Sequence, residues 1–550
     1  MDNIKIFSLG GQDEDGRNMY VVEVNDDIFL IDVGSKEAGE GQLGVEKIIP
    51  DFTYIKQNRK RVKALFITHA HDDALGALTN LLEEVKLPIY TTALTAEVIK
   101  PMLKAKNIDN VEVNIINRSD DFRVNKTRVR TFAMTNSVPD SFGLAISSPA
   151  GNIVYTSEFI VDYDIGLHAF ASDIVELAQI GKEKTFALLS ESVGSSKEGY
   201  TAPKHKISHV LEGYIDEAPA RIVITSYSQN IYRVIELAEL CFRNDKKLFF
   251  HDKDMLDMMH TLKKLDYYHM PESVVATLDD VEDKDTIVLV TGNGSEVFNK
   301  MFAITSGEDN RLSLKEDDTV IIASPIVAGV EVEAIQLENE LYKDDHIVIT
   351  IDKDELLAMH ASQEDLKMML YLFKPRYYIP VKGNYRHLVG NADLAMGLGY
   401  TSERIVILDN GQVATFEKGR FKNASNMVEA EDVMVDGTES LEEGSLVLKD
   451  RETLSTDGVI IVGVLIDHKT KEIIGGPDVQ TRGLIYVRDA NHVLKEVSNI
   501  MVETINKAVK ENRYTNMDVR SEVRSKAGRY VMKETGKRPM ILPSIVEINN

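Results

Sequence analysis

Residues 68–74, Thr-His-Ala-His-Asp-Asp-Ala, follow an apolar run at residues 64–67 and precede a second one that begins at Leu75. The first run predicts a short buried strand and the second predicts a helix start, so the polar residues occupy the loop between them. Imidazole nitrogens and carboxylate oxygens at a rigid strand end can bind one divalent ion. The alternative is a polar loop whose histidines cap the next helix. An earlier apolar strand that ends in a carboxylate, Asp32, and the glycine-rich residues 8–11 favour the metal site.

Length and composition exclude several classes of protein. A chain of 550 residues is too long for one core, so we expect two to four domains. No apolar stretch reaches the ~20 residues that a membrane helix needs, and residues 4–7 predict a strand rather than a signal peptide. The single cysteine, Cys241, excludes an internal disulfide and a multi-cysteine zinc site. We therefore expect a protein of the reducing cytoplasm that does not bind membranes.

The formal net charge of -25 argues against a protein that coats nucleic acid nonspecifically. It leaves room for an enzyme with a local basic groove. Each of two basic clusters is either part of such a groove or a solvated surface. The clusters are Lys56, Arg59, Lys60, Arg61 and Lys63, and then Lys374, Arg376, Lys382 and Arg386.

Alternating apolar and polar segments predict two α/β regions before residue 400. Strands are expected at residues 19–24, 28–31, 89–90, 153–156 and 187–190, and in the second region at residues 221–225, 286–290 and 319–323. Strands separated by helices predict a parallel sheet in the second region, where a helix starts at Ile231. Ser362, with an acid three positions later, predicts another helix start, and residues 377–381 predict a strand.

The last part of the chain predicts a linker and a small domain. Residues 429–443 are acidic and turn-rich, which is typical of a linker. Strands are expected at residues 459–462 and 484–487. A helix follows whose apolar face carries Leu494, Val497, Met501 and Ile505. This face is either built for oligomerisation or fully used within its own domain.

Several motifs together resemble one family. The loop at residues 68–74 is similar to the metallo-β-lactamase signature His-x-His-x-Asp-His, and the further stretches are residues 187–192, 225–230, 360–364, 374–383, 457–462 and 476–479. Over its full length the chain resembles bacterial ribonuclease J. The resemblance implies an α/β fold in which a metallo-β-lactamase αββα sandwich carries an inserted β-CASP α/β domain and a small C-terminal α/β domain. The implied division is 1–199 and 356–428 for the sandwich, 200–355 for the β-CASP domain, 429–450 for the linker and 451–550 for an oligomerisation domain.

The resemblance also implies an activity. Its members hydrolyse RNA with two metal ions, as 5′–3′ exonucleases and as endonucleases, in mRNA decay and ribosomal RNA maturation. The implied partners are RNA, further copies in a homodimer or tetramer, a ribonuclease J paralogue and components of an RNA degradosome.

This sequence departs from the family's metal ligands. His69, His71 and Asp73 match, and Glu158 stands where a bridging Asp is expected. Three expected histidines are replaced, by Ala74, Asn136 and Lys382. This pattern is typical of the second ribonuclease J paralogue of many Gram-positive bacteria.

The remaining ligands predict one divalent ion, Mn²⁺ or Zn²⁺, on His69, His71, Asp73 and Glu158. Asn136 could add a weak amide oxygen. Lys382 either brings an ammonium to the second metal position, where it would repel an ion, or faces solvent near the cleft.

The predicted catalytic residues are Asp73 and His360. Asp73 is a metal ligand or general base, or else a helix N-cap. His360 contacts a substrate phosphate or acts as general acid, or else is an interdomain histidine. The predicted substrate-binding residues are Leu356, Leu357, Ala358, Met359, His360, Ser226, Asn230 and Arg233, where Ser226, Asn230 and Arg233 alternatively cap a helix.

Two functions follow from these residues. The first is a weakened, mainly endonucleolytic ribonuclease, whose exonuclease activity suffers most because Ala358 and Met359 crowd the phosphate pocket. The second is a near-inactive RNA-binding subunit that stabilises an active ribonuclease J paralogue.

Overall fold

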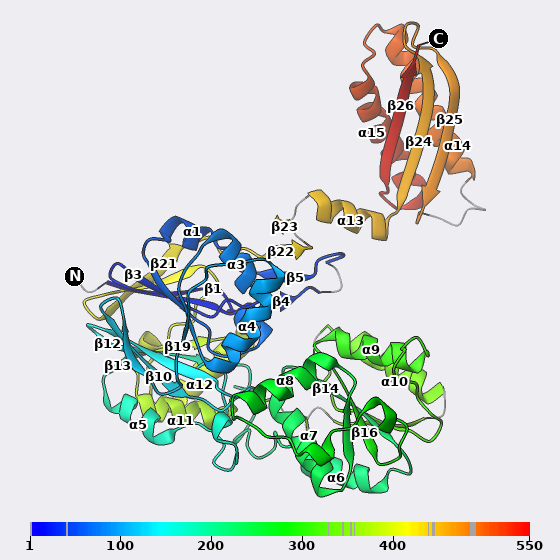
Figure 1. The fold of residues 1–550 in the computed structure, drawn as a ribbon. Coiled ribbons are helices and arrows are strands. Elements are labelled where there is room, and N and C mark those ends of the chain that lie inside the picture. Colours follow the sequence, from blue (N-terminus) through cyan, green and yellow to red (C-terminus); the bar gives the residue numbers. More distant parts are fainter. Residues whose placement is uncertain are drawn as a thin grey trace. The chain divides into compact units, whose positions relative to one another are not determined.

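A computed structural model of the chain (Figure 1) describes residues 3–39, 42–327, 329–343, 346–352, 355–356, 358–437, 439–442, 446–484 and 491–549. The chain forms two compact units. The first comprises Met1–Glu37 and Glu46–Thr438, and the second comprises Ala38–Val45 and Glu439–Asn550. Among the described helices, none is long and apolar enough to cross a membrane.

Two sheets stack in the first unit. The first sheet has the order β21-β20-β1-β2-β3-β6-β7-β8. Its strands are β1 (Asn3–Gly10), β2 (Met19–Val24), β3 (Asp27–Ile31), β6 (Val62–Phe66), β7 (Ile89–Thr91), β8 (Val113–Ile115), β20 (Gln412–Glu417) and β21 (Arg420–Met427). Strands β3, β6, β7 and β8 run parallel, whereas the others pair antiparallel.

The second sheet has the order β19-β13-β12-β11-β10-β9. Its strands are β9 (Asp121–Val124), β10 (Thr127–Ala133), β11 (Phe142–Ser148), β12 (Gly151–Tyr155), β13 (Thr185–Glu191) and β19 (Tyr377–Val381). Phe29 and Phe66 of the first sheet share one core cluster with Phe142 and Ile379 of the second. The two sheets therefore pack face to face, as expected for the inner layers of the sandwich.

Helices cover the outer faces of both sheets (Figure 1). The helices α1 (Thr53–Asn58), α3 (Leu78–Glu84) and α4 (Ala93–Ala105) pack on the first sheet. On the second lie α5 (Ile174–Lys182), α11 (Gln363–Phe373) and α12 (Tyr385–Gly397). The resulting layers confirm the predicted αββα sandwich. Helix α11 begins at the predicted position, since Ser362 and Asp365 form a capping box.

The inserted α/β part has a parallel sheet of order β15-β16-β14-β17-β18, as predicted. Its strands are β14 (Ile222–Tyr227), β15 (Lys247–Phe250), β16 (Thr286–Gly292), β17 (Thr319–Ile322) and β18 (Ile347–Thr350). One face packs on α6 (Ser208–Glu217), α7 (Ile231–Arg243) and α8 (Lys253–Lys264), and the other on α9 (Ser295–Thr305) and α10 (Glu331–Lys343).

The expected linker contains regular structure. Strand β22 (Val433–Asp436) pairs with β5 (Lys47–Ile49), which pairs with β4 (Lys36–Glu37). Strand β23 (Glu439–Glu442) and helix α13 (Leu446–Thr456) follow. An acidic, turn-rich composition therefore does not prevent short strands when a partner edge is available.

The second unit has a sheet of order β25-β24-β26. Its elements are β24 (Val459–Asp467), β25 (Ile473–Arg482), β26 (Met540–Ile548), α14 (Asn491–Lys510) and α15 (Asn516–Thr535). The prediction of a strand at residues 484–487 is wrong for Leu484, because β25 ends at Arg482 and Leu484 lies in a bend. Residues 485–487 lie outside the described part.

The predicted apolar face of α14 is used inside this unit. Val497, Met501 and Ile505 are fully buried with both helices and the sheet. Leu494 is only half-buried, and Val493 takes the core position instead. The opposite face of the sheet is the apolar surface that stays exposed. This sheet face comprises Ile461, Leu465, Ile474, Leu542, Val546 and Ile548.

Candidate metal centre

The histidine loop is fixed by a buried carboxylate from the neighbouring strand. Asp32 follows β3 with a positive φ of 60° and accepts hydrogen bonds from the backbone nitrogen (2.8 Å) and Oγ1 (3.0 Å) of Thr68. The hydroxyl of Tyr155 donates to its other oxygen at 3.2 Å. Burial raises the pKa of Asp32 to about 6, against the opposing effect of His69. Asp32 thus anchors the loop rather than facing the proposed ion.

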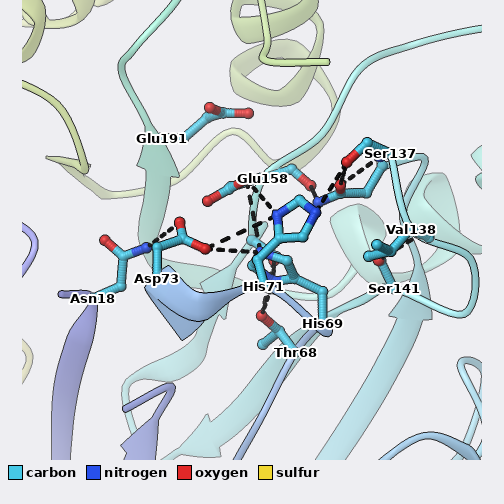
Figure 2. Close-up of polar contacts among 12 residues, drawn as sticks. Asn18, Thr68, His69, His71, Asp73, Ser137, Val138, Ser141, Glu158 and Glu191 are labelled. Carbon is cyan, nitrogen blue, oxygen red and sulfur yellow. Dashed lines mark hydrogen bonds and ion pairs between the residues drawn. The ribbon is translucent and has the colours of Figure 1, made fainter. Parts of the chain in front are cut away.

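Four predicted ligands converge at the end of β6 (Figure 2). His69 Nε2 lies 3.6 Å from Asp73 Oδ1 and 3.7 Å from Glu158 Oε2. His71 Nδ1 lies 3.9 Å and 3.7 Å from the same two oxygens. Ligand atoms at ~2.1 Å from a tetrahedral ion would be ~3.4 Å apart, close to these separations. The four residues therefore fit one divalent ion with little movement.

Two of the predicted ligand atoms make no hydrogen bond within the described part of the chain. His69 Nε2 and Asp73 Oδ1 are buried and have no hydrogen-bond partner among the described residues. Leaving such atoms unpaired is costly, so both are suited to bind an ion.

The remaining nitrogens of both histidines are held by neighbours (Figure 2). His69 Nδ1 lies 2.9 Å from Thr68 Oγ1. His71 Nε2 lies 3.1 Å from the carbonyl oxygen of Gln229 and 3.0 Å from Ser137 Oγ. Burial and the nearby His69 lower the pKa of His71 to about 3, so its ring is neutral. A neutral ring that donates from Nε2 presents Nδ1 as an acceptor, which is the form that binds metal.

Lys382 lies inside the site and not at the surface. Its side chain is 4% exposed, and Nζ contacts Asp73 Oδ2 and Glu158 Oε1 and lies 3.7 Å from Asp15 Oδ1. The alternative of a solvent-facing lysine is therefore wrong. Burial opposes ionisation of Asp73, but the ammonium of Lys382 and the neighbouring His69 hold the pKa of that carboxyl well below its usual range.

Two expectations do not hold: that Asp73 is alternatively a helix N-cap, and that Asn136 could offer its amide oxygen to an ion. Asp73 lies in the first turn of α2 (Asp72–Leu75), whose N-cap is His71, so Asp73 is not an N-cap. The amide oxygen of Asn136 accepts hydrogen bonds from the backbone nitrogen of Ser137 at 2.5 Å and from its Oγ at 3.1 Å. That oxygen is already engaged, and Asn136 instead orders the loop that carries Ser137.

His360 forms an ion pair that the sequence did not reveal. Its Nδ1 lies 2.7 Å from Glu191 Oε2, and Glu191 Oε1 accepts from the backbone nitrogens of Phe159 (2.7 Å) and Ala361 (3.1 Å). Burial lowers the pKa of His360, but Glu191 outweighs it and raises that pKa to about 9. His360 is therefore a cation at neutral pH. A glutamate at the end of the apolar strand β13 was the available signal.

The predicted substrate-binding residues that precede His360 do not share one environment. Leu356 and Met359 are buried in the core of the inserted part, Ala358 is exposed, and Leu357 lies outside the described residues.

The predicted substrate-binding residues Ser226, Asn230 and Arg233 lie between the end of β14 and the first turn of α7. Asn230 caps this helix by accepting from the backbone nitrogen of Arg233 at 3.0 Å, and Ser226 Oγ lies 3.4 Å from the Tyr227 carbonyl. Arg233 is buried, which lowers its pKa to about 10. The capping alternative therefore describes Asn230.

Gln229, which precedes Asn230, also reaches the site, and its position in the sequence alone gave no sign of this. Its carbonyl meets His71, and its Nε2 donates to Asp72 Oδ2 at 2.6 Å. The inserted part thereby contacts the metal loop directly.

Family models match three parts of the chain. Residues 13–205 match the metallo-beta-lactamase superfamily, residues 219–341 the ribonuclease J beta-CASP domain, and residues 446–548 the ribonuclease J C-terminal domain. With the αββα sandwich and the His/Asp/Glu cluster, these matches define a metallo-β-lactamase protein of the β-CASP class.

Curated relatives match the whole chain. Ribonuclease J 2 of Staphylococcus epidermidis is 31% identical over 99% of this chain and 98% of its own length, and ribonuclease J 2 of Staphylococcus aureus is 30% identical with the same coverage. The chain belongs to the ribonuclease J family, as its motifs predicted. A solved protein of unknown function from Enterococcus faecalis V583 covers 75% of this chain and 100% of its own, with a TM-score of 0.52 and 14% identity, which shows the fold alone. Family membership supports a ribonuclease, and the fold and cluster support a divalent metal site.

Proposed function

We propose that this chain is a metal-dependent RNA phosphodiesterase of the ribonuclease J type that works with one divalent ion and cleaves RNA slowly. The observation that carries the proposal is the cluster of four ligands in which His69 Nε2 and Asp73 Oδ1 are buried without partners among the described residues. Mixed nitrogen and oxygen ligation without sulfur suits Mn²⁺ or Zn²⁺. Its setting is RNA decay and ribosomal RNA maturation in the cytoplasm.

The protein's own groups have distinct roles in this proposal. A divalent ion bound at this site supplies water activation and neutralises phosphate charge. The low pKa of Asp73 makes it a weak base, so we assign it as a ligand, beside His69, His71 and Glu158. His360, a cation held by Glu191, binds a substrate phosphate.

We propose that cleavage is mainly endonucleolytic. The segment that would hold a terminal phosphate contributes two apolar side chains, Leu356 and Met359, to the core, and it presents no polar side chain between Leu356 and His360. Ser226, Asn230 and Arg233 remain our candidates for contacts to the nucleotide, through the loop that leads into α7.

A second function is favoured by Lys382. Its ammonium offsets one of the two negative charges of Asp73 and Glu158, so part of the charge compensation at this site comes from the chain itself. Such a chain could serve as a near-inactive RNA-binding subunit that stabilises an active ribonuclease J paralogue by mass action. Degradosome components are further candidate partners.

For assembly we propose the exposed sheet face of the second unit as the contact surface, in a homodimer or tetramer and with the paralogue. The helix face first expected for this role is buried. We retain the division into 1–199, 200–355, 356–428, 429–450 and 451–550 as the working domain scheme.

The test compares the full-length chain with His71→Ala on 5′-monophosphorylated and 5′-triphosphorylated RNA of one sequence, with and without Mn²⁺ or Zn²⁺. Metal-dependent internal cleavage that disappears in the variant supports the nuclease. Equal cleavage by both proteins overturns it. RNA binding without cleavage, together with co-purification of a ribonuclease J paralogue, supports the subunit role.

A further inference from the structure

Asp73 and Glu158 each direct one carboxylate oxygen toward the two histidines and the other toward Lys382. Asp73 Oδ1 and Glu158 Oε2 face the two histidines, at 3.6 to 3.9 Å. Asp73 Oδ2 and Glu158 Oε1 instead face Lys382. Each carboxylate thus bridges between an imidazole-lined position and a position that the ammonium fills.

The lysine is held in place by the backbone. It follows β19 with a positive φ of 56°, and its backbone nitrogen donates to the Gly11 carbonyl at 2.8 Å. Its carbonyl accepts from Ser192 at 3.1 Å. With the residue 3% exposed, the ammonium has no room to swing into solvent without unpacking the strand end.

The charge of Lys382 partly compensates the two carboxylates on the side away from the histidines. Two buried carboxylates beside each other require compensating positive charge. The two carboxylates share the ammonium, which offsets one of their two negative charges, and Asp15 Oδ1 lies 3.7 Å from Nζ. A second divalent ion would have to share that space with a cation, which is unfavourable both sterically and electrostatically. The residues present therefore do not fit a second metal.

We infer that Lys382 is a tethered cation that permanently occupies the second metal position, so that the carboxylate pair is assembled before any ion binds and only one ion can be bound. The inference rests on the metal site of the proposed function, but it concerns binding and not cleavage. It predicts that the identity of residue 382 sets the metal stoichiometry.

The experiment measures Mn²⁺ per full-length chain by equilibrium dialysis, the electron paramagnetic resonance signal of the bound Mn²⁺, and the thermal unfolding of the metal-free protein. The natural chain should bind one equivalent with a mononuclear signal. Lys382→Ala and Lys382→His remove the ammonium and leave space. Both variants should bind a second equivalent, with an affinity at least ~10-fold above any second binding that the natural chain shows. The bound Mn²⁺ pair should then give an exchange-coupled signal.

Two further variants separate charge from space. Lys382→Arg keeps the charge, and should stay at one equivalent. Lys382→Met keeps the length without the charge, and should lower the unfolding temperature of the metal-free protein. The matched control is Lys300→Met, because Lys300 also joins two carboxylates, Asp252 at 2.5 Å and Glu296 at 2.8 Å, without touching the ligands. It should leave the stoichiometry at one.

Two equivalents in the natural chain, or one equivalent with unchanged affinity in both Lys382→Ala and Lys382→His, would overturn the inference. If Lys382→Ala does not fold, Lys382→His decides the question. A chain with one bound ion that cuts no RNA would refute the proposed function and leave this inference standing.

Discussion

The ion pair between His360 and Glu191 should make the stability of this chain depend on pH. Glutamine at position 191 is a suitable perturbation, because one carboxylate oxygen accepts both backbone hydrogen bonds and the other faces His360 Nδ1. Glu191→Gln can keep the first oxygen and present an amide to the imidazole. The two backbone bonds then survive while the ion pair is lost.

The magnitude follows from the pKa of His360, which is about 9 in the folded chain. The unfolded value is ~6.5, and a difference of ~2.5 units corresponds to roughly 3 kcal/mol. Because the folded pKa is raised, this contribution is fully present below pH ~6.5 and is lost as the pH rises through about 9. The stability advantage of the natural chain over Glu191→Gln should therefore shrink by roughly 3 kcal/mol across this window.

Urea unfolding of both full-length proteins between pH 6 and 9.5, followed by tyrosine fluorescence, measures this difference. Subtracting the free energies of unfolding of the two proteins at each pH removes the contribution of groups that titrate alike in both. Glu417→Gln is the control, since Glu417 pairs with the exposed Lys422 on a surface strand and should give a constant difference. A stability difference between natural chain and Glu191→Gln that stays constant over the whole range would refute the reasoning.

Three other perturbations test the site and the assembly. Thr68→Val removes the hydroxyl that contacts His69 Nδ1 and Asp32, and should weaken Mn²⁺ binding by roughly 10- to 100-fold in a calorimetric titration; unchanged affinity would show that the hydroxyl does not orient the ligand. His71→Ala should reduce the metal that survives dialysis by more than ~10-fold in elemental analysis, because it deletes one of four ligands; retention of a full equivalent would place the ion elsewhere. Leu542→Asp on the exposed sheet face should shift the mass measured by light scattering toward the monomer, whereas Met517→Asp at an exposed position of α15 should not; equal masses for both would remove the sheet face as the contact surface.

Much of the local structure was determined by the sequence alone. Strands β2 and β19, the start of α7 and the capping box before α11 all lie where apolar runs and capping residues predicted them. These features depend on neighbours within a few positions, and such neighbours are visible in a sequence. The same holds for His69, His71 and Asp73, which one strand exit brings together.

Tertiary structure alone decided which distant groups meet at that exit. The ammonium of Lys382 reaches Asp73 across 309 positions of the chain, and Glu191 reaches His360 across 169. Spacing along the chain carries no information about such pairs, because parallel strands from different segments align their ends only after the sheet has formed. The sequence could therefore place a lysine in the family's ligand position, but only the fold showed its charge between the two carboxylates.

The second unit shows the same division in its packing. The periodicity of Val497, Met501 and Ile505 determined that α14 has an apolar face. It could not determine whether that face meets its own sheet or another chain, because burial in either place leaves the same pattern. Packing within the unit consumed the helix face and left the far side of the sheet exposed, since a sheet of alternating apolar residues can be covered by these two helices on one side only.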